Sequence, residues 1–263
     1  MEIAHRHGIL TAASLMVAAP AAADAVARAH AMPELSVGLH LMLVEGKPIL
    51  PPRQVSHLVG PDGRFHANMA AAGASMFFDP RARGQLEAEI AAQFDAFAAT
   101  GLPLDHVNAH KHFHLHPTIA GLILKIGARH GLRAARAPVE PAEVLNRIEP
   151  EPGGFGQIVF HLMAHALGSR LRHAGLTAPD QVFGLRWSGA MTTRRLRGLI
   201  ENLPPGLTEI YLHPATANAY PGSAPGYRYI EELAALTAPE VIAAVEASGN
   251  ITGGFMTLLS AAT

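Results

Sequence analysis

The sequence contains no cysteine, and this absence narrows the kinds of site it can hold. Without thiols the chain can form neither disulfide bonds nor thiolate metal centres. Any metal ion that it binds must therefore be held by nitrogen and oxygen ligands.

Excess positive charge is also lacking. The chain has 20 Lys and Arg residues against 21 Asp and Glu residues, with no basic tract, so a nucleic-acid or anionic-membrane surface has no electrostatic support. No apolar run reaches the length of about 18 residues that a membrane span needs. We expect no nucleic-acid partner and at most a peripheral membrane contact.

The first 25 residues, MEIAHRHGILTAASLMVAAPAAADA, allow two interpretations. Basic-type residues, an apolar stretch and small residues together resemble an export signal. Glu2 interrupts the would-be basic region, however, and Pro20 with Asp24 reads as the start of a helix. The second interpretation is favoured, and it predicts a cytoplasmic protein.

What the chain does have is ample core. Hydrophobic residues make up 49% of the 263 residues and charged residues 16%, which is typical of a folded globular chain. Chains of this length can form one α/β barrel. We therefore expect a single domain over residues 1–263.

Short apolar runs alternate with helical patterns along the chain. Strands are predicted over 9–17, 36–44, 104–110, 132–137, 207–213 and 251–256, and helices over 20–32, 86–100, 118–130, 157–174, 231–236 and 239–248. This alternation predicts parallel strands joined by crossover helices, and hence an α/β fold with a barrel-like sheet.

Histidine is the unusual residue, with 16 copies, and five of these lie in HVNAHKHFHLHP at 106–117. Side chains alternate between the faces of a strand, so His106, Asn108, His110 and His112 are expected on one side. For His114 and the histidine that follows, an exposed loop is an equally good interpretation.

Polar side chains also collect where predicted strands end. His40, His110, Arg136 and His213 all occupy such places, and active sites of parallel α/β folds are built there. His40 alone would be better explained as a hydrogen-bonded core histidine. Together with His110 it becomes the best second ligand of a metal site, since catalytic sites usually take three protein ligands.

Two other patterns look functional but lack an essential residue. In HLMAH, His161 and His165 have the spacing of a zinc-protease helix, but Leu162 replaces the general-base Glu. GGFG at 153–156 lacks the Lys-Ser/Thr of a phosphate loop. We interpret the histidine pair as structural and GGFG as a turn.

Four segments together resemble the YdjC-like carbohydrate deacetylase family, and most closely its branch associated with hopanoid biosynthesis. They are GLHLMLVEGKP (39–48), LDHVNAHKHFHLHP (104–117), LRAARAP (132–138) and YLHPA (211–215). The resemblance implies a distorted (β/α) TIM-like barrel that hydrolyses the N-acetyl group of a sugar. It also implies one divalent metal ion as cofactor, with Mg and Zn as the first candidates. The implied substrate is N-acetylglucosamine, either as a small molecule or linked to a lipid. In the hopanoid branch the implied substrate is an N-acetylglucosaminyl hopanoid. A homodimer is compatible with it.

The resemblance also assigns residues. His40 and His110 match metal ligands, and Asn108 stands where the family often has Asp, in a positioning role. His213 matches the histidine that protonates the leaving amine or steadies the tetrahedral intermediate, and Arg136 the arginine that orients a catalytic carboxylate or the substrate. Lining of the sugar pocket is implied for two further residues, His112 and His114.

One family feature has no counterpart in the sequence. The family opens with a strand ending in an Asp-Asp pair, which supplies a metal ligand and the general base, whereas MEIAHRHGIL aligns just past that pair. The other acids do not replace it: Asp62, Asp79 and Asp95 fall in loop or helix, and Asp105 is expected to point away from His106. Either the start is placed too late, or the chain is a natural truncation that lacks the base, one metal ligand and a barrel strand. We favour a misplaced start, because a barrel without its first strand exposes two edges. The chain as written is then expected to be a weak or inactive metal binder, while the gene product is an enzyme.

Three other functions compete with this one. Another metal-dependent amidohydrolase would carry H-x-H on its first strand and usually recruit a late Asp, whereas here the histidine cluster lies mid-chain and no Asp follows the late His-Pro pair. A histidine-rich storage protein would bind several ions weakly. A degenerate sugar- or lipid-binding barrel would keep the pocket and lose turnover.

Overall fold

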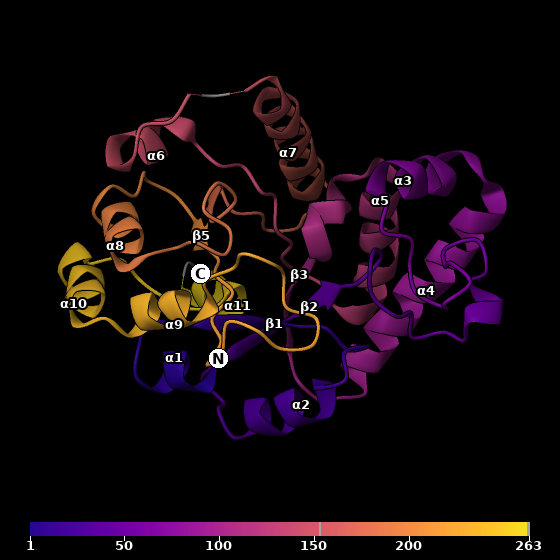
Figure 1. Ribbon diagram of the computed structural model, residues 1–263, viewed down its shortest axis with the longest axis horizontal. Coiled ribbons are helices and arrows are strands. Elements are labelled where there is room, and N and C mark those ends of the chain that lie inside the picture. Colours follow the sequence, from indigo (N-terminus) through magenta and orange to yellow (C-terminus); the bar gives the residue numbers. More distant parts are fainter. Residues whose placement is uncertain (153, 262–263) are drawn as a thin grey trace. The chain divides into compact units, whose positions relative to one another are not determined.

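The computed structural model describes residues 1–152 and 154–261 (Figure 1). Gly153, part of the predicted GGFG turn, lies outside this part of the chain. The described residues form two compact units. Unit 1 contains 1–11, 137–168 and 178–253, and unit 2 contains 12–136, 169–177 and the segment from Gly254 onward. A single domain stays a prediction.

Unit 2 is built on a parallel sheet of strand order β1-β2-β3. The strands are β1 (Ala12–Leu15), β2 (Ser36–Leu41) and β3 (Leu104–Ala109). Single parallel bridges continue the ladder from Val107 to Ala135 and from Ala134 to Thr177. The α/β class with parallel strands is thereby confirmed, whereas a closed barrel stays a prediction.

Helix α4 (Pro80–Ala98) of unit 2 begins at a side-chain cap. Asp79 accepts a hydrogen bond from the Arg81 amide, and Pro80 occupies the first turn, where its missing N–H costs nothing. The resulting helix α4 buries Ile90 and Phe94 at helical spacing. The helices lying wholly in this unit are α2 (Ala22–His30), α3 (Met69–Phe78), α4 (Pro80–Ala98), α5 (Pro117–Gly127) and α11 (Phe255–Ala261), with 3-10 turns η1 (Pro52–Gln54), η2 (His110–Leu115) and η3 (Ala128–His130).

Unit 1 contains a parallel pair of strands, β4 (Gln181–Phe183) and β5 (Thr208–Ile210). The Val182 amide of β4 donates a 2.7 Å hydrogen bond to the Val139 carbonyl. Its helices are α1 (Glu2–Arg6), α6 (Ala142–Ile148), α8 (Thr193–Glu201), α9 (Tyr229–Thr237) and α10 (Pro239–Ser248), while α7 (Phe155–His173) has residues in both units.

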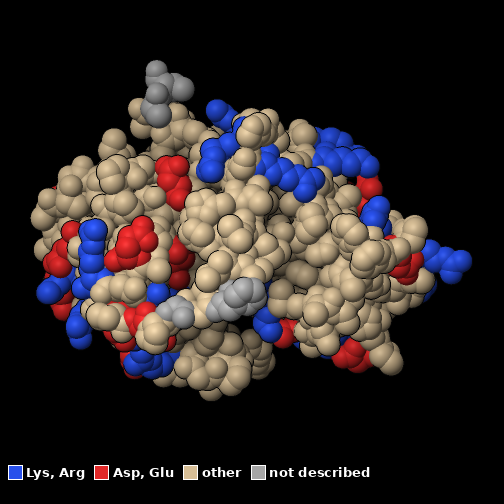
Figure 2. All heavy atoms as spheres, turned by 90° about the horizontal axis from the view of Figure 1, so that it is seen from above, with Lys and Arg blue, Asp and Glu red and all other residues tan. Residues whose placement is uncertain are grey.

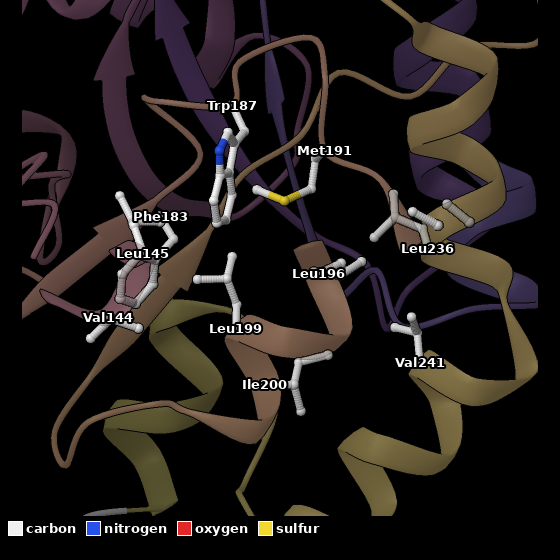
Figure 3. Packing of buried hydrophobic residues seen from close by; sticks show 12 residues of the cluster. Val144, Leu145, Phe183, Trp187, Met191, Leu196, Leu199, Ile200, Leu236 and Val241 are labelled. Carbon is white, nitrogen blue, oxygen red and sulfur yellow. The ribbon is translucent and has the colours of Figure 1, made fainter. Parts of the chain in front are cut away.

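An apolar cluster fills the core of unit 1. Figure 3 shows Trp187 and Met191 beside Leu199 of α8, with Phe183 of β4 next to the side chains of α6. Phe183 and Leu199 have no exposed surface. Burial of such side chains contributes about 1.5–3 kcal/mol each to folding.

Most predicted elements are found, with shifted ends, but some predictions are wrong. The strand expected over 251–256 is not formed, because Phe255 and Met256 begin α11. The strand expected over 132–137 is reduced to the two single bridges. The prediction also missed α3, α6, α8 and β4.

The surface carries charges of both signs. On the face in Figure 2 most atoms belong to uncharged residues, and acidic and basic side chains both appear among them. None of the described helices combines the length and apolar character needed to cross a bilayer.

Truncating Phe183 to alanine should test the core of unit 1. We expect the free energy of unfolding to fall by about 3–5 kcal/mol, because the change leaves a cavity. Phe78→Ala is the matched control, since Phe78 is 79% exposed, and it should change little. Urea unfolding followed by circular dichroism measures both, and equal effects would contradict the packing described.

Candidate active site

Two histidines meet at the carboxyl end of the sheet in unit 2. His40 lies in β2, and His110 follows β3 directly. Their ring centroids are 5.9 Å apart, and the ring planes cross at 71°. Parallel register explains the meeting, because His40 pairs with Asn108 on the neighbouring strand, two residues before His110.

A line of hydrogen bonds runs back from His40 into the protein. His40 Nδ1 lies 2.6 Å from Asn108 Oδ1, and Asn108 Nδ2 donates to Ser14 Oγ over 3.0 Å. Ser14 Oγ lies 2.9 Å from His106 Nε2. His106 Nδ1 lies 2.8 Å from Asp105 Oδ2. We call these five residues the relay.

The relay ends on the backbone of α11. The Asp105 carboxylate accepts hydrogen bonds from the amides of Phe255 at 3.1 Å and Met256 at 2.9 Å. Burial alone would raise the pKa of Asp105, but its bonds to His106 and to these amides outweigh burial and lower it. The carboxylate is therefore ionised at neutral pH and supplies the charge that orients His106.

Donors and acceptors along the relay fit a single direction. An ionised Asp105 accepts from His106 Nδ1–H, which leaves His106 Nε2 to accept from the Ser14 hydroxyl. The Ser14 oxygen then accepts from Asn108, whose carbonyl oxygen accepts from His40 Nδ1–H. Neutral His40 therefore carries its proton on Nδ1 and its lone pair on Nε2, the state in which a histidine can ligate a metal.

Close backbone approach lets the relay form. A Cβ added to Gly38 of β2 would lie 2.5 Å from the His106 ring, so only glycine fits beside that ring. The register of β2 and β3 also shifts between Val37 and Leu39, and irregularities of this kind re-aim side chains. The expectation that Asp105 points away from His106 is wrong, because at this shift the two side chains are hydrogen-bonded.

The histidines after β3 do not continue the strand. Residues His110–Leu115 form the 3-10 segment η2, in which Lys111 and His112 have φ values of +52° and +54°. His112 therefore does not share a strand face with Asn108, contrary to expectation. His114 is buried, with Nε2 3.1 Å from the Arg136 carbonyl oxygen, which excludes the exposed-loop interpretation.

Glu45 is a site residue that the sequence reasoning missed. Its carboxylate contacts Lys111 Nζ and lies 3.3 Å from His110 Nε2. The hydrogen bond from Lys111 lowers the pKa of Glu45, and burial lowers that of His110. Glu45 directly follows the apolar run predicted as a strand over 36–44, four residues after β2 ends at Leu41, and this position could have pointed to it. Its φ of +65° is rare for a non-glycine residue.

The donors present suit a divalent metal ion in type but not in number. His40 and His110 offer nitrogen ligands, but the described residues contain no group of three or more His, Cys, Asp or Glu side chains placed to hold an ion. His161 and His165, on α7, have their Nε2 atoms 2.9 Å apart, and both residues are exposed.

The remaining predicted residues have defined surroundings. Arg136, in unit 2, is buried, and its backbone N–H donates a hydrogen bond to the Val107 carbonyl oxygen. In unit 1, His213 donates its backbone N–H to the Glu232 carboxylate, which also accepts from the Met191 amide at 3.1 Å. Burial raises the pKa of Glu232 against the effect of these bonds.

Comparison with known proteins agrees with this architecture. The family described as YdjC-like protein matches residues 1–247. The chain belongs to that family. A carbohydrate deacetylase of Geobacillus stearothermophilus is 29% identical over 250 residues, covering 94% of this chain and 85% of the relative. The human carbohydrate deacetylase is 29% identical over 266 residues, and the match covers 92% of this chain and 80% of the human protein.

A solved structure shares the fold of this YdjC-like protein. It belongs to a protein of Enterococcus faecalis whose description proposes cellobiose-phosphate cleavage. The TM-score is 0.71, with 22% sequence identity and coverage of 97% of this chain and 90% of the other. At this identity the likeness supports the α/β fold alone.

Asp105→Asn should destabilise the protein in a pH-dependent way. At neutral pH we expect a loss of about 1.5–3 kcal/mol, because a charged acceptor of hydrogen bonds is removed. The folded-state pKa of Asp105 lies below the usual 3.8, so its stabilisation is complete above pH 3.8 and is lost as the pH falls through the folded-state value. The difference from wild type should therefore shrink in acid. Urea unfolding as a function of pH measures it.

Asp62→Asn is the control for this change, because Asp62 is an exposed loop residue. It should leave the stability nearly unchanged at neutral pH. A pH-independent effect of Asp105→Asn would contradict an ionised carboxylate at the end of the relay.

In the Ser14→Ala variant, the ring proton of neutral His40 should no longer be confined to Nδ1. The change removes the group that links Asn108 to His106, so we expect His40 to become a mixture of Nδ1–H and Nε2–H tautomers. Nitrogen-15 NMR of the histidine rings reports the proton position. His114 provides an internal control, since its Nε2 bond to the Arg136 carbonyl does not involve Ser14. An unchanged His40 tautomer would refute the relay.

Proposed function

We propose that this protein is a metal-dependent carbohydrate N-deacetylase that removes the acetyl group from an N-acetylated sugar. Curated relatives named carbohydrate deacetylase, matched over most of the chain, support the hydrolase class. The relay is the structural observation that supports the proposal, because the tautomer that it favours would let His40 act as a metal ligand beside His110.

The reaction splits an amide bond with water. The water oxygen bonds to the carbonyl carbon, the C–N bond breaks, and acetate and the free amino sugar are released. A bound divalent ion would lower the pKa of the water and polarise the carbonyl. His40 Nε2 and a nitrogen of His110 would hold the ion, with a carboxylate such as the family's Asp as the third ligand.

The protein's own residues handle the leaving group and the substrate. His213 would donate a proton to the departing nitrogen, which must leave as a neutral amine. Glu232 fixes the backbone of His213 by accepting its amide hydrogen. Arg136 would orient the substrate, Asn108 positions His40, and His112 and His114 would line the sugar pocket.

The finer identity of the substrate rests on the resemblance of sequence segments. We propose an N-acetylglucosaminyl group, on a hopanoid lipid in hopanoid glycolipid biosynthesis. The acetylated amino sugar is the part recognised at the reacting centre. Mg or Zn would serve as the metal, since imidazole with carboxylate suits several divalent ions.

One observation favours a second candidate, a sugar-binding protein without turnover. Among the described residues the donor set beside His40 and His110 is incomplete, and Glu45 is engaged by Lys111. Such a protein would bind an acetylated sugar and release no acetate.

Acetate release separates the two candidates. The protein purified from its native host is incubated with N-acetylglucosamine after chelation and again after adding back Mg or Zn. We expect acetate only with added metal. Binding of the sugar with no acetate under any metal would favour the second candidate.

His40→Ala tests the ligand assignment directly. We expect metal affinity, measured by calorimetry, to fall at least about a hundredfold, since even partners of ligands cost 10–100-fold. His7→Gln serves as a control, because His7 is exposed and belongs to unit 1, whereas His40 belongs to unit 2. If both variants bound metal like wild type, His40 would not be a ligand.

A further inference from the structure

A cluster of aromatic rings in unit 1 has no part in the chemistry proposed above. The chain has four tyrosines, Tyr211, Tyr220, Tyr227 and Tyr229, and all lie within 19 positions between β5 and the start of α9 (Figure 1). We call them the tyrosine cluster. They are all the tyrosines of the protein, so the amino-acid composition of this segment differs strongly from that of the rest of the chain.

The rings form a continuous series that includes His213. The His213 centroid lies 5.6 Å from that of Tyr211 and 5.2 Å from that of Tyr227. Tyr229 follows at 5.5 Å from Tyr227, and Tyr220 at 5.1 Å from Tyr229. These spacings are those of attractive ring pairs. The series connects the proposed proton donor to Tyr220.

Tyr227 is held in place by its surroundings. A Cβ added to Gly189 would lie 2.2 Å from Cγ of Tyr227, so the ring lies against a backbone that must be glycine. Gly189 also has a φ of +73°. The Tyr227 hydroxyl is 2.8 Å from Ser188 Oγ. Ring and hydroxyl are thus both fixed before any ligand arrives.

Tyr220 is the accessible end of the series. Tyr229 is buried, and its hydroxyl oxygen accepts a 2.7 Å hydrogen bond from the Ala224 amide. Tyr220 is 43% exposed. Burial and its neighbour Tyr229 raise the pKa of Tyr220 to about 12, so the phenol is neutral at physiological pH. What this end offers is an uncharged aromatic ring on a fixed support.

The composition of the segment indicates the class of ligand. Between Tyr211 and Tyr229 the one charged residue is Arg228, which pairs with Glu231 at 3.0 Å, and the one large aliphatic residue is Leu212. An anionic ligand would call for basic groups, and a lipid chain for a wider aliphatic surface. Aromatic faces without charge suit a neutral molecule that has both C–H and hydroxyl groups, as a pyranose does.

We propose that the tyrosine cluster is a sugar-binding platform, on which the exposed ring of Tyr220 stacks against a pyranose ring of the substrate. The assignment deepens the proposed deacetylase function and rests on it. It places recognition of the sugar on unit 1 residues that continue from His213.

Two substitutions separate the ring from its hydroxyl. Tyr220→Ala removes the stacking surface and should weaken binding of N-acetylglucosamine by about threefold to tenfold, the range that aromatic contacts contribute. Tyr220→Phe keeps the ring and should bind like wild type. Phe78→Ala, which removes an exposed ring from unit 2, should also bind like wild type.

Binding is measured on the full chain by calorimetry and by saturation-transfer NMR of the sugar protons, after circular dichroism confirms that each variant is folded. Equal affinity of Tyr220→Ala and wild type would overturn the platform, as would a Tyr220→Phe variant as weak as Tyr220→Ala, or no sugar binding by the wild type.

Turnover separates this proposal from the one on which it rests. If the wild type releases acetate, Tyr220→Ala should raise KM with little change in kcat. If the wild type binds the sugar and Tyr220→Ala binds it less, but no acetate forms, the platform stands and the deacetylase function fails. Acetate release with identical KM in both proteins would overturn the platform alone.

Discussion

Asp105 carries an ionised carboxylate in the interior of unit 2, and both the relay and the start of α11 depend on it. A buried charge is costly unless it is paired and hydrogen-bonded. Here the compensation comes from His106 next to it on β3 and from the first amides of α11, about 150 residues later in the chain. The same carboxylate thus joins the end of the described chain to the middle of the sheet.

The tautomer of His40 follows from this charge by a series of local requirements. The Asp105 carboxylate can only accept, and each following member uses a donor toward the residue before it, which leaves an acceptor for the residue after it. Networks of this kind fix a unique arrangement when all members are satisfied and are costly when one is missing. The chemistry proposed for His40 therefore depends on the residues behind it in the relay, and the same hydrogen bonds contribute to stability and fix the His40 tautomer.

The sequence predicted the α/β class and the meeting of His40 with His110 because both follow from regular strands, whose alternation and register are periodic. It could not predict the Asp105–His106 bond, which depends on a register shift at Gly38. It also placed His112 on a strand that stops at Ala109. Ser14 and Glu45 gave no motif, since a serine in a short strand and a glutamate after one are common.

Those misses have a common origin. The sequence pattern predicts a regular strand through segments whose backbone is in fact irregular. Lys111 and His112, for example, have positive φ values, so their side chains do not follow strand alternation. Irregular backbone is costly and persists where surrounding contacts impose it. Asp105 and His106 also departed from the prediction, and the candidate site depends on them. At the register shift of β2 and β3 beside them, the surrounding contacts are the hydrogen bonds of the relay.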